Sequence, residues 1–245
     1  MAKIVSIHSF RPGTGKSAVA ANIATVLAAS GLRVGIIDSD AQSPQIHALF
    51  GVPAAAIQHS LNDFMWGSCT ITQTAHDISH FISDRLKGTI FLIPFTTRPD
   101  DIDYDISLLS DSFQLLTRAL SLDVLLIDTP PGLDNTTLPT LAFSDLQLVI
   151  LRPDDQDFLG TSVTIDVAQR LGVPAMMLIV TQVPESLDIA GVRQQVERAY
   201  GCEVIAVLAE SAELPALARP GLFVAYYPNH PITIELTRVA AVLTA

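Results

Sequence analysis

The chain has 245 residues, of which 49% are hydrophobic, and its 14 basic and 25 acidic side chains give a formal net charge of −11 at pH 7. Nucleic-acid binding depends on cationic contacts to phosphates, so this balance argues against strong non-specific binding to DNA. Cys69 and Cys202 have no paired spacing, so neither a disulfide framework nor a cysteine-ligated metal or iron–sulfur site is supported.

The length and the absence of Gly/Ser-rich or Pro-rich linkers predict a single domain over residues 1–245. No apolar run approaches the roughly 18 residues of a membrane span. The first residues lead directly into a strand and lack a secretory signal pattern. We therefore expect a soluble, cytoplasmic protein.

The first predicted elements are a strand over 3–7 and a helix over 17–30 that ends before Gly31. The loop between them, FRPGTGKS over 10–17, matches most of the phosphate-binding pattern G-x-x-x-x-G-K-[ST]. In this context backbone N–H groups converge on an anion at the helix N-terminus, where the helix dipole is positive. We expect Lys16 to reach terminal phosphates and the Ser17 hydroxyl to bind Mg²⁺. The predicted nucleotide-binding residues of the loop are Gly13, Thr14, Gly15, Lys16, Ser17 and Ala18.

Three residues of this loop depart from the pattern. Phe10 replaces the first glycine, and Pro12 removes one backbone donor. Arg11 adds a second cation, whose planar fork could hold phosphate oxygens beside Lys16. The alternative for Arg11 is a solvated surface charge.

The second predicted strand, over 33–38, ends in two carboxylates one residue apart, Asp38 and Asp40. In an extended segment these side chains would lie on the same side. One could support the metal shell while the other orients a water molecule for attack on a phosphoryl group. The alternative is an acidic turn before a helix that begins near Ser43 and Pro44.

The strand over 123–128 ends in Asp128, followed by Thr-Pro-Pro-Gly132. Asp128 has the layout of a Walker B acid, whose carboxylate would hold a water molecule bound to Mg²⁺. The segment that follows this acid often senses the γ-phosphate in nucleotide switches, so Gly132 is either part of such a switch or part of a simple turn.

Later strands are predicted over 146–150, 176–180 and 203–207. Thr181, Gln182 and Ser211 follow two of them and are expected to flank a base. No Asn-Lys-x-Asp arrangement is present there, which favours ATP over GTP. Strands that alternate with helices predict a doubly wound, mainly parallel α/β sheet with helices on both faces, and ligands bind such sheets at the carboxyl ends of the strands.

Together, the phosphate loop, Asp38-x-Asp40 and Asp128-Thr-Pro-Pro-Gly132 resemble the ParA/MinD family of deviant Walker A ATPases, over essentially the whole chain. In that family the loop reads K-G-G-x-G-K-[ST], and its first lysine reaches the partner's phosphates across a nucleotide-sandwich dimer. Arg11 corresponds to that lysine and Pro12 to the first glycine. The resemblance implies a P-loop fold with ATP and Mg²⁺ as cofactors. It implies these roles: Lys16 binds phosphate, Ser17 binds Mg²⁺, Asp40 activates water, Asp128 is the Walker B acid and Asp38 supports the metal site.

The function that this resemblance implies is a homodimerisation switch with slow, partner-stimulated ATP hydrolysis, which positions or partitions a cargo through a protein adaptor. Arg11 could then stabilise the transition state in trans, as an arginine finger does. The residues 234–245 carry one arginine and one acid, which favours a packed helix over a membrane anchor. Two alternatives stay open: a small-molecule synthetase related to the dethiobiotin and cobyrinic acid synthetases, and a regulator that binds nucleotide without hydrolysing it.

Overall fold

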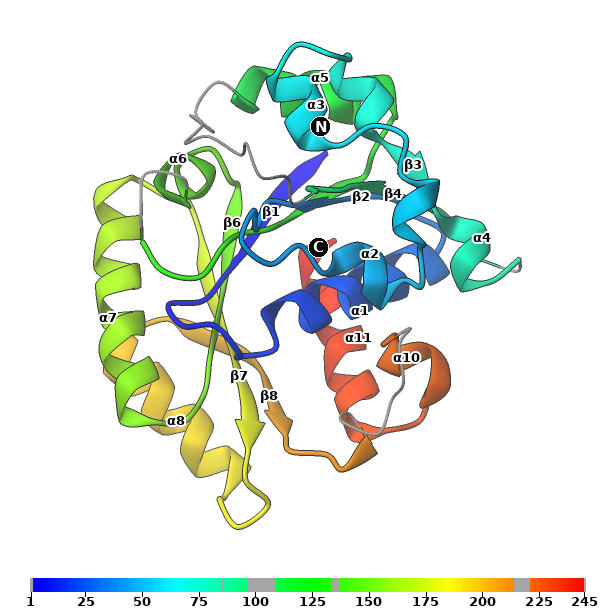
Figure 1. Cartoon of the computed structure of the whole chain (residues 1–245). Helices are drawn as coiled ribbons and strands as arrows, with labels where there is room; N and C mark the ends of the chain where they lie inside the picture. The colour runs from blue at the N-terminus through cyan, green and yellow to red at the C-terminus, as the bar shows by residue number, and fades with distance from the viewer. Residues whose placement is uncertain (1, 85, 97–108, 134–136, 214–220, 245) are drawn as a thin grey trace.

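The centre of the fold is one sheet of eight strands in the order β3-β4-β2-β5-β1-β6-β7-β8 (Figure 1). The computed structural model describes residues 2–84, 86–96, 109–133, 137–213 and 221–244. Neighbouring strands run parallel, except for the antiparallel pair of β3 and β4. The strands are β1 (Lys3–His8), β2 (Arg33–Asp38), β3 (His76–Asp77), β4 (Thr89–Ile93), β5 (Val124–Asp128), β6 (Leu146–Leu151), β7 (Met176–Val183) and β8 (Glu203–Ala209).

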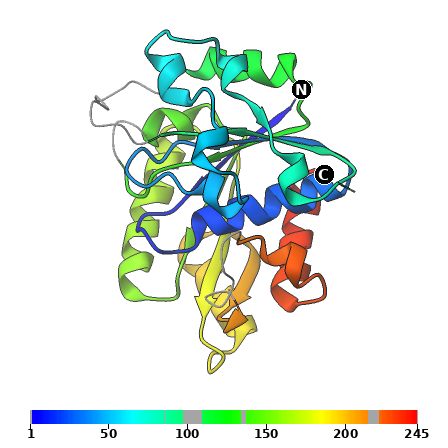
Figure 2. The ribbon, with the colours of Figure 1, turned by 45° about the vertical axis from the view of Figure 1, so that its right-hand side comes forward.

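Helices cover both faces of this sheet, which confirms the predicted fold class. The core on one face joins the sheet to α1, α2, α10 and α11, and the cores on the other face join it to α3, α5, α7 and α8. The turned view in Figure 2 shows α1 and α11 together on their side of the sheet. The helices are α1 (Lys16–Ala29), α2 (Ile46–Leu49), α3 (Leu61–Met65), α4 (Ser79–Ile82), α5 (Ser110–Ala119), α6 (Thr137–Ala142), α7 (Asp155–Arg170), α8 (Ile189–Tyr200), α10 (Phe223–Tyr226) and α11 (Pro231–Leu243), with 3₁₀ turns η1 (Ala54–Ala56) and η2 (Ile71–Thr74).

The strand register brings the predicted acidic residues to one edge of the sheet. Asp128 of β5 lies opposite Ile7 of β1 on one side and opposite Asp38 of β2 on the other. All five residues of β5 are buried, as expected for a parallel strand covered on both faces. The loop that follows β1 therefore leaves the sheet next to both carboxylates.

The helix α1 begins directly after Gly15, which has a left-handed φ of 83°. No side chain caps this end of the helix. The N–H groups of the first turn are consequently not bound by a capping side chain, and such groups favour an anion. No described helix has the length and apolar character that a membrane crossing requires.

Helix α7 approaches the loop closely through Gly160. A Cβ atom at position 160 would lie 1.9 Å from Cδ1 and 2.2 Å from Cγ of Phe10. Phe10 is the residue that replaces the first glycine of the phosphate-loop pattern, and its ring occupies the space that Gly160 leaves on α7. The first half of the loop is therefore packed against a helix from the second half of the chain.

We expect Gly160→Ala to lower the free energy of unfolding by about 1–3 kcal/mol, because overpacking outweighs the ~1 kcal/mol gain in helix propensity. In a Phe10→Ala background the same change should be neutral or stabilising. Urea denaturation of the four variants of this cycle measures both effects, and Ser162→Ala on the exposed side of α7 is the control. Equal destabilisation in both backgrounds would show that the contact with Phe10 is unimportant.

Candidate nucleotide-binding site

A cavity of about 240 Å³ lies between the loop after β1 and the turn after β2. Gly13 and Gly15 shape its wall with φ angles of 80° and 83°, which residues with side chains rarely adopt. All six predicted loop residues and the predicted water-activating residue line it. The lining residues are Ser9, Pro12, Gly13, Thr14, Gly15, Lys16, Ser17, Ala18, Asp40, Ser43, Gln45, Leu49 and Pro131.

Lys16 forms a buried ion pair with Asp128. Its Nζ lies 2.6 Å from Asp128 Oδ1, and the two side chains are only 7% and 1% exposed. A buried cation needs a partner because desolvation of an isolated charge is very costly. The ion pair places the predicted phosphate lysine and the predicted Walker B acid in direct contact at the cavity.

Asp38 lies next to this ion pair and is itself 1% exposed. Its carboxylate accepts hydrogen bonds from the backbone N–H groups of Asp40, Gln45 and Ile46 at 3.2, 2.9 and 3.0 Å. Burial raises the pKa of Asp38 to about 8, and the negative charge of Asp128 adds to the shift, while the hydrogen bonds from Ile46 and Asp40 and the charge of Lys16 oppose it. Asp38 thus holds the turn over 39–46 in place.

Asp40 has a different environment from Asp38. Its side chain is partly exposed, lines the cavity and accepts hydrogen bonds from the N–H groups of Gln42 and Ser43, both at 3.1 Å. The expected same-side placement assumed an extended chain, whereas β2 ends at Asp38 and the chain turns. The alternative, an acidic turn followed by a helix, matches the local structure, although α2 begins at Ile46 rather than near Ser43 and Pro44, and the Asp38 carboxylate binds its first N–H group.

The segment after Asp128 is bonded to the end of β1. The Thr129 hydroxyl donates to the Ile7 carbonyl at 3.1 Å and lies 2.8 Å from Nδ1 of the buried His8. Further along, the N–H of Gly132 donates to the Ser9 carbonyl at 3.1 Å, with Gly132 at a φ of 87°. This arrangement places Gly132 against the start of the loop, and its switch role stays a prediction.

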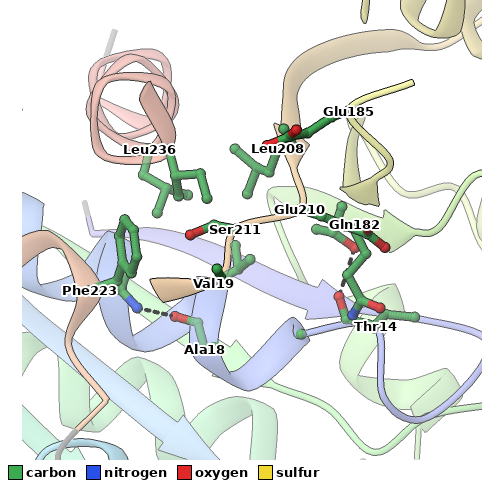
Figure 3. Close-up of a pocket in the computed structure, with 16 residues that line it drawn as sticks. Thr14, Ala18, Val19, Gln182, Glu185, Leu208, Glu210, Ser211, Phe223 and Leu236 are labelled. Carbon is green, nitrogen blue, oxygen red and sulfur yellow. Dashed lines mark hydrogen bonds between the residues drawn. The ribbon is translucent and has the colours of Figure 1, made fainter. Parts of the chain in front are cut away.

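A second, larger cavity of about 770 Å³ adjoins the first and shares Thr14, Gly15 and Ala18 with it. Its volume is typical of small-molecule sites. Figure 3 shows Phe223 and Leu236 at one end of this cavity and Thr14 and Gln182 at the other. The lining residues are Thr14, Gly15, Ala18, Val19, Asn22, Thr181, Gln182, Glu185, Leu208, Ala209, Glu210, Ser211, Ala212, Phe223, Ile232 and Leu236.

The predicted base-flanking residues Thr181 and Gln182 also hold the loop. Thr181 Oγ1 donates to the Thr14 carbonyl and Gln182 Nε2 to the Gly13 carbonyl, both at 2.7 Å. The two residues belong to β7 rather than following it, because the strand continues to Val183. The pairing with β8 shifts between Val180 and Val183, where these two residues lie. Gln182 sits at this irregularity with a left-handed φ of 53°, a conformation that residues with side chains adopt mainly at special sites.

Arg11 lies outside the described lining of both cavities. Its Nη1 atom is 3.1 Å from Asp154 Oδ1 and 3.5 Å from Asp157 Oδ1, at the N-terminus of α7. The expected position beside the phosphates is therefore not the one that the structure shows. The reason is the pair of acids, which lies more than 140 residues away in the sequence and offers Arg11 a nearby counter-charge.

Sequence reasoning missed several lining residues. Asn22 is 2% exposed, and its amide donates to the Ala18 carbonyl and accepts from the N–H of Val224. A polar residue at this position of a mostly apolar helix was a signal that the sequence offered. Glu185 and Phe223 come from segments that carry no local motif, so only the fold brings them to the cavity, whereas Glu210 adjoins Ser211, which was expected there and lines it.

Comparisons with known proteins place the chain among ATPase-related sequences. A family model described as an AAA domain, AAA_31, matches residues 2–172. The uncharacterized ATP-binding protein MJ0547 of Methanocaldococcus jannaschii is 24% identical, with 99% of this chain and 88% of that protein covered. The iron–sulfur cluster carrier protein of Pseudomonas fragi is 26% identical, with 97% and 83% covered.

Solved structures of cell-division proteins share the fold. A chain of the MinC:MinD complex of Aquifex aeolicus matches with a TM-score of 0.84 at 19% identity, covering 99% of this chain and 95% of that chain. MinD of Pyrococcus horikoshii, solved with Mg-ADP, matches with a TM-score of 0.81 at 18% identity, covering 98% and 95%. These matches confirm the resemblance to the ParA/MinD family at the level of the fold. Since its model spans more than half of the sequence, the chain belongs to the AAA_31 family of AAA domains.

Proposed function

We propose that this protein is an ATPase of the ParA/MinD type, which binds ATP with Mg²⁺ and dimerises in response. The observation that carries the proposal is the buried pair of Lys16 and Asp128 at a cavity walled by glycines and by the N-terminus of α1. A nucleoside triphosphate needs a cation and backbone N–H groups for its phosphates, and its metal needs a carboxylate. This edge of the parallel sheet supplies all three.

The two adjoining cavities suit the two ends of ATP. The smaller cavity offers Lys16 and the loop N–H groups to phosphates, and the larger one has apolar walls for a base and ribose. Thr14 supports this fit, because its buried hydroxyl has no hydrogen-bond partner within the described part of the chain. The fold and the MinD relative solved with Mg-ADP are in keeping with the same assignment.

The cation would be held by Ser17 and, through water, by Asp128, both of which supply the oxygen ligands that Mg²⁺ prefers. No three His, Cys, Asp or Glu side chains gather into a metal site in the described ranges. A cation bound by few protein ligands and by phosphate is the usual arrangement for Mg²⁺ in ATPases, where it neutralises phosphate charge.

Asp40 is the residue we assign to water activation. It is accessible from the phosphate cavity, and its Oδ1 is fixed by two backbone N–H groups. Burial raises the pKa of Asp38 to about 8, so its carboxyl group is mostly protonated at pH 7 and cannot accept a proton from water. Its role is to position the turn that carries Asp40 and to support the metal site.

Dimerisation and the action on a cargo through a protein adaptor follow from the ParA/MinD resemblance. Arg11 would act on the partner's phosphates, as the signature lysine does in that family. A synthetase role is less favoured, because cations for a second, acidic substrate are few near the cavities. A role as an iron–sulfur carrier is also disfavoured. Cys69 precedes η2 and Cys202 precedes β8, so the two thiols belong to different parts of the chain. Burial raises the pKa of both thiols, which disfavours the thiolate form that binds a cluster.

We expect Lys16→Gln to weaken ATP binding by about 10- to 100-fold, the value of one or two charge-assisted hydrogen bonds. Glutamine can still donate to Asp128, so the fold should persist. Titration with a fluorescent ATP analogue measures the affinity, and thermal melting checks the fold. The exposed Lys87→Gln is the matched control. Unchanged affinity in Lys16→Gln would remove this loop from nucleotide binding.

We expect wild-type protein to be monomeric without nucleotide or with ADP, and dimeric with ATP and Mg²⁺. Asp40→Ala should abolish most phosphate release and accumulate the dimer, because removal of a general base typically costs 10²- to 10⁴-fold in rate. Light scattering after size exclusion, combined with a phosphate-release assay, reads both outcomes. Wild-type protein that stays monomeric at saturating ATP would contradict the dimer model.

We expect Arg11→Ala to lower turnover on the order of 10³-fold, as loss of an arginine finger does, while ATP affinity changes little. The reason is that Arg11 is bonded to α7 and lies outside the described cavity lining of its own chain. Steady-state phosphate release and the fluorescent titration separate the two effects. If turnover is unchanged, Arg11 has no part in hydrolysis.

A further inference from the structure

Two arginines and two aspartates meet at the N-terminus of α7. Asp154 is the N-cap of this helix, with its carboxylate accepting from the N–H of Asp157 at 3.0 Å. The Asp157 side chain is only 2% exposed, whereas that of Asp154 is 42% exposed. Arg11 comes from the phosphate loop, and Arg152 directly follows β6. The cluster carries two positive and two negative charges.

The two arginines divide the carboxylate oxygens between them. Nη1 of Arg11 contacts the Oδ1 atoms of both acids, at 3.1 and 3.5 Å. Arg152 contacts the Oδ2 atoms, with Nη2 at 3.3 Å from Asp154 and Nε at 3.3 Å from Asp157. The backbone N–H of Arg152 also donates to Asp157 Oδ2, at 2.9 Å. Each acid therefore has two cationic partners.

Arg11 is bound to the two acids by fewer contacts than Arg152 is. Arg11 uses a single nitrogen and has no described backbone bond to the acids, while Arg152 uses two side-chain nitrogens and its backbone N–H. If Arg11 left, the buried Asp157 would keep Arg152 on its other oxygen. A buried carboxylate without any cation would be strongly unfavourable, so Arg152 removes the main obstacle to the departure of Arg11.

We propose that Arg152 is a positioning residue, which keeps the α7 carboxylates neutralised so that Arg11 can exchange from its own chain to the phosphates of a partner subunit. This inference rests on the proposed role of Arg11 in trans. Arg152 does not touch nucleotide in this scheme. It sets how tightly Arg11 is retained on α7, and so how readily the dimer becomes competent for hydrolysis.

The test is Arg152→Gln. With one cation left for two carboxylates, Arg11 should be retained more firmly, and ATP turnover should fall by about 10-fold or more. The ATP affinity of the monomer should stay within about twofold, because the contacts between loop and phosphate are untouched. The result is thus a fall in kcat at an unchanged Kd for nucleotide.

Charge balance can be restored by a second substitution. Asp157→Asn removes the buried carboxylate, so Arg11 can leave without stranding a buried charge, and the amide oxygen of the substituted side chain can still accept from the N–H of Arg152. In the Arg152→Gln background it should return turnover to within about threefold of wild type, an interaction that a double-mutant cycle detects. Arg152→Lys keeps the charge and should also remain close to wild type. Thermal melting of each variant checks the fold, and Arg238→Gln, which removes an exposed arginine paired with Glu235 on α11, is the control.

The outcomes separate this inference from the proposed function. If Arg11→Ala leaves turnover unchanged, the role of Arg11 in trans is wrong, and the role of Arg152 is wrong with it. If Arg11→Ala lowers turnover but Arg152→Gln does not, only the role of Arg152 is overturned. A loss of turnover in folded Arg152→Gln that Asp157→Asn fails to rescue would likewise overturn it.

Discussion

The buried ion pair between Lys16 and Asp128 is the constraint on which the rest of the site depends. A desolvated lysine is tolerated only with a carboxylate in contact, and the carboxylate must come from a strand next to the loop. The order of β2, β5 and β1 in the sheet meets this requirement, because it sets Asp128 between Asp38 and the start of the loop. Asp38 then avoids a second buried negative charge through its raised pKa. One cation and one anion remain, and phosphate and metal can compete for each.

Side chains of β7 orient the backbone of the phosphate loop. Thr181 and Gln182 bind the carbonyls of Thr14 and Gly13, and in a trans peptide the next N–H points the opposite way. The N–H groups of Gly15 and Thr14 are thereby directed away from β7. The strained φ of Gln182 is the local cost of this support. Residues that the sequence assigns to base recognition thus also prepare the phosphate cradle.

Local patterns allowed the loop, the strands and their acidic ends to be predicted from the sequence. Gly15, Lys16 and Ser17 act through neighbours along the chain, and apolar runs define β5 and its end at Asp128. The contacts of Arg11 and Phe10 could not be predicted in this way. They join the loop to Asp154 and Gly160, which are far away in sequence and carry no motif. The helix-capping role of Asp38 was missed for a related reason, since it spans seven or eight residues of an irregular turn.

Two of the three departures of the loop from the usual pattern act together, while the third, Pro12, lines the smaller cavity. Phe10 packs on Gly160 and Arg11 pairs with Asp154 and Asp157, so the first half of the loop is fixed to α7. The second half keeps the ordinary residues and faces the cavity. Because both halves share one short backbone, Phe10 and Arg11 connect α7 to the residues that line the cavity. The outer side of α7 exposes Leu159, 73% accessible, and Val163, 50% accessible. The helix that retains Arg11 therefore has an exposed apolar side as well as the side that holds the loop.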